Sequence, residues 1–184
     1  MRPFDVPKRD EVNEQNKKIF DDLKSKLGFV PNIYATYAYS DNGLGRYLSF
    51  ANGKTSLNNK EKEVVNLIVS QVNGCTYCQA AHTALGKMNG FTEEQTIQLR
   101  TGEAPFNAKF DALVKLAKTV AENSGKVTDE VLENFFAAGY TKENLVDVII
   151  NVGEKATTNY LHNVTKIPVD FPEAPSIEEF KQAS

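Results

Sequence analysis

The sequence lacks both a long apolar run and an excess of basic residues. No stretch approaches the roughly 20 apolar residues that span a bilayer, and the charged N-terminus is not followed by an apolar segment of signal-peptide length. The formal net charge of -3 leaves no cationic stripe of the kind that neutralises phosphates. We therefore expect a cytoplasmic protein that binds neither membranes nor nucleic acids.

Cysteine is scarce as well, since the chain has only Cys75 and Cys78. In a reducing compartment such a close pair is more often catalytic or metal-binding than a structural cross-link. A disulfide between them would also close too short a loop to restrict the unfolded chain much. The pair is therefore a candidate for chemistry.

Alternating β-branched runs bounded by hairpin turns are absent too, whereas apolar residues recur at helical spacing along nearly the whole chain. With 184 residues, of which 41% are hydrophobic, the chain can bury one substantial core but is short for two. We predict a single all-α domain. It comprises N-terminal helices in residues 1–56, a helical core in 57–166 and an extended C-terminal tail in 167–184, where prolines interrupt any helix.

Capping residues and glycines predict the helix boundaries. Two pairs have the spacing of a capping box, in which two side chains three residues apart bond each other's backbone N–H groups: Asn58 with Glu61, and Thr92 with Gln95. Further helices are predicted over 11–28, 33–39, 44–52, about 75–90 and about 142–164, with a short final helix capped by Ser176. The tail has little core of its own, so we expect it to pack along a neighbouring surface of this chain or of another subunit.

The two cysteines and a nearby histidine share one helix face. Cys75, Cys78 and His82 stand at i, i+3 and i+7, which brings them together over about two turns. The unpaired N–H groups of a helix start favour the thiolate of Cys75, and His82, one turn after Cys78, can take or return its proton. Glu63, one helix earlier, can orient or charge the imidazole because Gly74 lets the chain turn back.

We predict that the three-helix unit carrying these residues occurs twice. Adding 49 to each position superposes Gly90-Phe91-Thr92 on Gly139-Tyr140-Thr141, and the apolar pattern of the first helix recurs at the same offset. The second copy has other residues at the positions of the glutamate, the two cysteines and the histidine: Ala112, Ser124, Val127 and Val131. The first copy then holds the chemistry, and the second is scaffold.

The spacing Glu63-x11-Cys75-x2-Cys78-x3-His82 resembles the signature of the AhpD-like alkylhydroperoxidases in the carboxymuconolactone decarboxylase superfamily. The resemblance is good over residues 57–92, and residues 28–32 are similar to a segment of the peroxidase-related branch. It implies an all-helical fold with an internal repeat, assembly into trimers or hexamers, and reduction of organic hydroperoxides through the cysteine pair. This chain departs from the family's best-studied members at Tyr77, where they have a histidine.

The residues together suggest a mechanism. Glu63 and His82 draw the proton from Cys78, which attacks the outer peroxide oxygen and becomes a sulfenic acid. Cys75 then resolves this acid to a disulfide, which a dithiol reductant protein reduces, although the two cysteines can also be assigned in the reverse order. We expect neither a metal nor a cofactor to take part.

Other readings of the same residues compete with this one. Zinc could bind Cys75, Cys78 and His82 with Glu63 or His162, but three ligands crowded on one helix suit a closed tetrahedral site poorly. The cysteines could also be inert and buried. The functional rivals are a non-catalytic redox-sensing or partner-binding stress protein and a carboxymuconolactone-type decarboxylase, which gains nothing evident from a cysteine pair.

Two further residues have simpler readings. His162, on the last long helix, is interpreted as a hydrogen-bonded or surface histidine. Glu154, beside the apolar stretch 146–152, is interpreted as a paired, half-buried acid with no assigned role.

Overall fold

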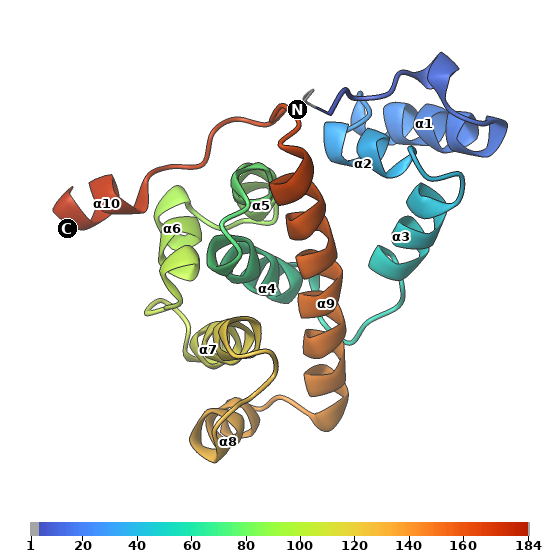
Figure 1. Ribbon diagram of the computed structural model, residues 1–184. Helices are drawn as coiled ribbons and strands as arrows, with labels where there is room; N and C mark the ends of the chain where they lie inside the picture. The colour runs from blue at the N-terminus through green and yellow to red at the C-terminus, as the bar shows by residue number, and fades with distance from the viewer. Residues whose placement is uncertain (1–3, 184) are drawn as a thin grey trace. The chain divides into compact units, whose positions relative to one another are not determined.

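The computed structural model describes residues 4–183, and all regular structure in this range is helical (Figure 1). This confirms the predicted all-α class. Contacts divide the described residues into two compact units, one comprising residues 4–54 and 161–170 and the other comprising 55–160 and 171–183. None of the described helices combines the length and apolar character needed to cross a bilayer.

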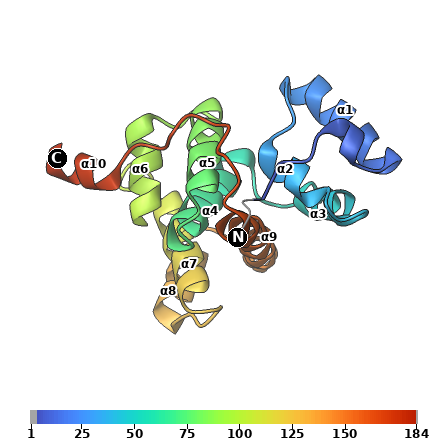
Figure 2. The ribbon, with the colours of Figure 1, turned by 45° about the horizontal axis from the view of Figure 1, so that its top comes forward.

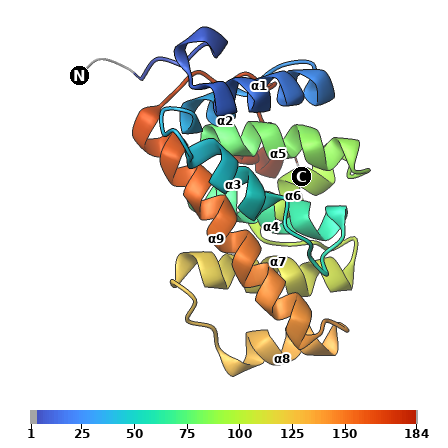
Figure 3. The ribbon, with the colours of Figure 1, turned by 90° about the vertical axis from the view of Figure 1, so that its right-hand side faces the viewer.

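The larger unit is built around α4 (Asn59–Val72). This helix packs against its neighbours α5 (Thr76–Met88), α6 (Glu93–Thr101) and α7 (Ala108–Glu122), and Figures 1 and 3 show α5 and α7 on opposite sides of it. The unit also contains α8 (Asp129–Ala137), which packs on α7, residues up to 160 of α9 (Lys142–Thr165), and α10 (Ile177–Ala183). Because α4 has neighbours on several sides, its apolar residues are buried around much of its circumference: Val64, Val65, Leu67, Ile68 and Val69.

Local signals fix the ends of α4. Asn58 and Glu61 form the predicted capping box, and the start of the helix is also tied to α9, because Asp147 accepts hydrogen bonds from the backbone and hydroxyl of Ser56 at 2.6 and 2.7 Å. The helix ends before Gly74, whose φ of 62° lies in the left-handed region that favours glycine. This turn sends the chain back along α4 as α5.

The smaller unit contains η1 (Arg9–Glu11), α1 (Glu14–Leu27), α2 (Asn32–Tyr37) and α3 (Gly43–Ala51). Its core is formed by Val12, Phe20, Ala35, Ala38 and Leu44. The first α-helix begins later than predicted, because Asn13 acts as the N-cap and accepts the N–H of Asn16 at 2.8 Å. It ends at Gly28 as predicted, where φ is 85°.

The helix spacing agrees with the predicted repeat. The first helical residue of α7 follows that of α4 by 49 positions, and the start of α9 follows that of α6 by the same number. The two copies differ in length, however, because α6 has 9 residues and α9 has 24. The part of α9 beyond residue 150 therefore has no counterpart in α6.

The C-terminal tail packs on its own chain. Within the smaller unit, Asp170 accepts the backbone N–H of Asn32 at 2.7 Å. Within the larger unit, the buried guanidinium of Arg100 donates to the Pro175 carbonyl at 2.7 Å, and α10 packs against α6 (Figure 2). The same guanidinium donates to Gln71 and Gln79 at 3.0 and 3.4 Å. Arg100 thus ties the tail to α4, α5 and α6.

We predict that Arg100→Ala frees the tail while the helical fold persists. A hydrogen bond from a charged donor contributes about 1.5–3 kcal/mol, which corresponds to an opening equilibrium more than tenfold larger. Backbone hydrogen exchange in residues 171–180, followed by mass spectrometry, should accelerate accordingly. Arg46→Ala, which changes an exposed arginine, is the control. Equal exchange in both variants would contradict the tether.

Candidate active site

The cysteine pair begins α5. Cys75 and Cys78 form a disulfide, and Cys75 is the N-cap residue whose sulfur accepts the backbone N–H of Cys78 at 3.2 Å. The predicted position at a helix start is therefore confirmed. The first-turn N–H groups and the helix dipole favour negative charge on sulfur at this point.

Exposure does not distinguish the two cysteines. Cys75 is 0% exposed and Cys78 is 2% exposed. Greater access to an external reductant therefore does not favour Cys75 over Cys78 as the resolving cysteine. What distinguishes the two sulfurs is their surroundings, because Cys75 caps the helix and Cys78 lies one turn before His82.

Glu63 and His82 form a buried pair between α4 and α5. Glu63 Oε2 lies 2.8 Å from His82 Nδ1, and the two residues are 7% and 8% exposed. An ionised carboxylate can only accept hydrogen bonds, so Nδ1 carries the proton and donates it. The other ring nitrogen, Nε2, is then the one that can exchange a proton with a thiol.

The environment favours the ionised form of Glu63. Burial alone would raise its pKa, but the opposing effects of His82, Lys155 and the amide of Asn66 outweigh burial and bring the pKa below its usual value. Glu63 is therefore a carboxylate at neutral pH. It can orient the imidazole and stabilise its positive charge.

A chain of polar contacts extends the site to α9. Asn66 donates to Glu63 Oε1 at 3.2 Å and accepts from Asn151 at 2.9 Å. Asn151 also donates to Glu154 Oε2 at 3.4 Å, and the other oxygen of Glu154 lies 3.5 Å from Lys155 Nζ. The interpretation of Glu154 as a paired acid is confirmed. Asn151, Glu154 and Lys155 lie in the part of α9 that has no counterpart in α6.

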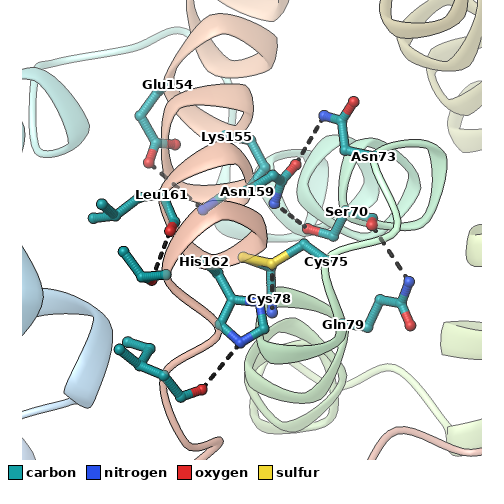
Figure 4. The surroundings of a disulfide bond; sticks show 12 residues. Ser70, Asn73, Cys75, Cys78, Gln79, Glu154, Lys155, Asn159, Leu161 and His162 are labelled. Atoms are coloured by element: carbon teal, nitrogen blue, oxygen red, sulfur yellow. Dashed lines mark hydrogen bonds and ion pairs between the residues drawn. A yellow bond between two sulfur atoms is a disulfide. The ribbon is translucent and has the colours of Figure 1, made fainter. Parts of the chain in front are cut away.

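A second polar group holds the turn that precedes the cysteines. The fully buried Asn159 of α9 donates to the Ser70 hydroxyl at 3.3 Å and accepts from Asn73 at 2.9 Å. Gln79 donates to the Ser70 carbonyl at 3.4 Å. Figure 4 shows these contacts around the disulfide. The end of α4, the start of α5 and the middle of α9 are thus held together.

Sequence reasoning missed most of these α9 residues. Asn151, Lys155 and Asn159 are spaced by four, so they follow one face of the helix. Polar residues at this spacing, starting near the end of an apolar stretch, could have predicted a polar contact face on this helix. This pattern did not show which neighbouring helix that face would contact.

Packing accounts for Tyr77, and a hydrogen bond accounts for His162. Tyr77 is 1% exposed and packs edge-on against Phe171, with ring centroids 5.7 Å apart, which fits a packing residue. His162 is buried, and its Nε2 lies 3.2 Å from the Ile167 carbonyl, as expected for a hydrogen-bonded histidine. Burial lowers the pKa of His162, against the opposing effects of Ile167 and Asn163. Among residues 4–183, no group of three or more His, Cys, Asp or Glu side chains is arranged to hold a metal ion.

Comparisons with known proteins agree with this geometry. Residues 42–121, which include the glutamate, both cysteines and the histidine of the site, match the model of the carboxymuconolactone decarboxylase family. Two solved structures with a similar fold are uncharacterized peroxidase-related proteins. The one from Ralstonia eutropha JMP134, described as an alkylhydroperoxidase AhpD core, is 20% identical, with a TM-score of 0.83 over 91% of this chain and 92% of that one. The one from Silicibacter sp. TM1040 is 22% identical, with a TM-score of 0.82 over 95% of each chain.

A third solved structure with this fold is an enzyme of different chemistry. The debrominase Bmp8 is 14% identical, with a TM-score of 0.73 over 91% of this chain and 90% of that one. A variant of Bmp8 has been solved in complex with 2,3,4-tribromopyrrole. These structural likenesses establish the fold, and the family match covers the residues of the site. The chain thus has the fold of AhpD-like proteins, and its residues 42–121 are similar to the carboxymuconolactone decarboxylase family.

Proposed function

We propose that the protein is a thiol-dependent peroxidase that reduces organic hydroperoxides through Cys75 and Cys78. The observation that carries the proposal is the buried Glu63–His82 pair, with a 2.8 Å hydrogen bond, one helical turn from Cys78. A carboxylate that orients an imidazole beside a thiol is an arrangement that activates sulfur as a nucleophile. The family match over these residues supports the same reading.

The first half-reaction oxidises Cys78. In the reduced protein, His82 Nε2 takes the thiol proton while Nδ1–H donates to Glu63. The thiolate attacks the outer oxygen of the hydroperoxide, and the O–O bond breaks as the S–O bond forms. The alkoxide leaves as an alcohol after protonation by His82, and Cys78 is left as a sulfenic acid.

The second half-reaction forms the disulfide. The thiol of Cys75 gives its proton to the now neutral His82, and the resulting thiolate attacks the sulfur of the sulfenic acid. The S–O bond breaks as the S–S bond forms, and the hydroxide takes that proton and leaves as water. The Cα atoms of the two cysteines are 5.3 Å apart, within the usual range for disulfides, so the helix start need not unwind. A dithiol reductant then restores both thiols by disulfide exchange.

We predict that the reduced protein consumes an organic hydroperoxide in the presence of a dithiol reductant, and that Cys78→Ser abolishes this turnover. Cys75→Ser should permit one oxidation of Cys78 but block catalytic turnover, because the resolving thiol is missing. Peroxide loss and the mass of the cysteine peptide provide the measurements.

The same assay separates the rival functions. Reversible disulfide formation with no peroxide turnover under any reductant would favour the redox sensor. Because a debrominase shares the fold, 2,3,4-tribromopyrrole is included as a second substrate. Its debromination without peroxide turnover would also contradict the proposal. Loss of a carboxyl group from a muconolactone by both cysteine variants would favour the decarboxylase.

Glu63→Gln and His82→Gln should each slow alkylation of the reduced protein at neutral pH by about 10²–10⁴-fold, as expected for groups that assist proton transfer. Raising the pH should recover much of the rate, because solvent then supplies the thiolate. Iodoacetamide kinetics across pH test both parts, with the exposed Glu94→Gln as control. Unchanged kinetics in both variants, with circular dichroism showing folded protein, would reduce the two residues to structural roles.

We also propose that the protein forms a closed homo-oligomer, a trimer or a hexamer. An exposed apolar stripe on α9 supports this, since Val146, Ile149 and Ile150 are 59%, 45% and 46% exposed. Open space beside Gly153 continues the stripe by one turn. A contiguous apolar face of this kind marks a contact surface.

Ile150→Glu is therefore expected to lower the mass measured by light scattering at micromolar concentration towards that of a single chain. The buried charge of the new carboxylate would oppose association. Met88→Glu changes a residue that is 82% exposed on another helix and should leave the mass unchanged. A monomeric wild-type protein would reject the assembly.

A further inference from the structure

Lys155, on the part of α9 that belongs to the larger unit, is a buried lysine. It is only 4% exposed, and Figure 4 draws it, with Glu154, among the residues around the disulfide. Burial of an ammonium group is costly unless the charge is compensated. A lysine kept in this place therefore needs an explanation beyond packing.

The positive charge of Lys155 is partly compensated by the carboxylate of Glu154, the residue directly before it in the chain. Lys155 Nζ lies 3.5 Å from Glu154 Oε1, although consecutive residues on a helix point in directions about 100° apart. Both side chains thus converge on the same buried space. Glu154 is fixed there through Asn151, which also bonds Asn66, the amide that holds Glu63.

The positive charge of Lys155 acts across helices on the acid of the candidate active site. After His82, it is the charge that most lowers the pKa of Glu63. Lys155 is paired with Glu154 on its own helix, its charge acts on Glu63 of α4, and Figure 4 draws it among the residues around the cysteine pair of α5. Two carboxylates and one ammonium group carry a net charge of minus one.

The balance matters when a thiol loses its proton. Without Lys155, a thiolate would form beside two buried carboxylates and a protonated His82, so the site would hold one positive charge fewer. With Lys155, the charges of the two carboxylates are compensated once His82 is protonated, and the thiolate alone is left. The ammonium group thus favours deprotonation of the site as a whole.

We propose that Lys155 is a positioning residue for the thiol chemistry, whose buried charge, held in place by Glu154, balances the two carboxylates when Cys78 becomes a thiolate. The inference rests on the proposed function in that Cys78 is taken as the reacting thiol. It adds a third helix, α9, to the machinery that activates that thiol.

The test is the pH dependence of iodoacetamide alkylation of Cys78 in reduced Cys75→Ser protein. Adding Lys155→Met should move the midpoint of the alkylation curve to higher pH by about one unit or more, which is about tenfold slower alkylation below the midpoint. Lys155→Arg keeps the charge and should leave the midpoint close to that of the parent. Glu154→Gln removes a negative charge and should shift the midpoint to lower pH.

The controls separate a local charge effect from loss of structure. Circular dichroism establishes which variants are folded. If Lys155→Met does not fold, because it removes the ion-pair partner of Glu154, the Glu154→Gln, Lys155→Met double variant replaces it. The charge of Lys155 affects Glu63 more strongly than the charge of Glu154 does. The double variant should therefore move the alkylation midpoint in the same direction as Lys155→Met, but by a smaller amount. An unchanged midpoint in the folded variant would overturn the proposal.

The readout is independent of peroxide turnover. A shifted midpoint in a protein that consumes no hydroperoxide would leave the role of Lys155 standing and reject the peroxidase. An unshifted midpoint in a protein that does consume hydroperoxide would reject only the role of Lys155.

Discussion

The hydrogen bond between Glu63 and His82 is the constraint on which the site depends. A buried carboxylate is tolerated only where opposite charge and donors compensate its loss of water. For Glu63 these come from three directions, namely His82 on α5, Asn66 on its own helix and the charge of Lys155 on α9. The charge of Glu63 is therefore compensated only when α4, α5 and α9 are packed together.

The turn between α4 and α5 sets the register of that packing. Gly74 takes the left-handed conformation, and the next N–H, that of Cys75, bonds back to the Ser70 carbonyl at 3.0 Å. Asn159 holds the Ser70 hydroxyl from α9. Because the turn ends directly at Cys75, the residue that caps α5 is also one of the two cysteines, and helix formation itself brings its sulfur to the N–H groups that favour its anion.

The features that could be predicted from the sequence are those encoded within a few residues. The capping boxes and the shared face of Cys75, Cys78 and His82 depend only on helical spacing, and the structure contains them. The prediction that α1 starts at residue 11 was wrong. Asp10 and Asn13 can both cap a helix, and only the structure shows that Asn13 is the cap. The contacts of Lys155 could not be predicted, because they depend on how far α9 extends and which helix it faces, and neither is encoded locally.

The two copies of the repeat show why only one holds a cysteine site. Cys75 has an extended backbone with φ of -84° and caps α5, whereas its counterpart Ser124 has φ of 53° and is followed by Gly125 at 84°. With two left-handed residues at this point, the next helix begins only at Asp129. A sulfur at position 124 would lack the first-turn N–H groups that meet Cys75. The extension of α9 beyond the repeated part instead brings Asn151, Lys155 and Asn159 to Asn66, Glu63 and Ser70 of the first copy.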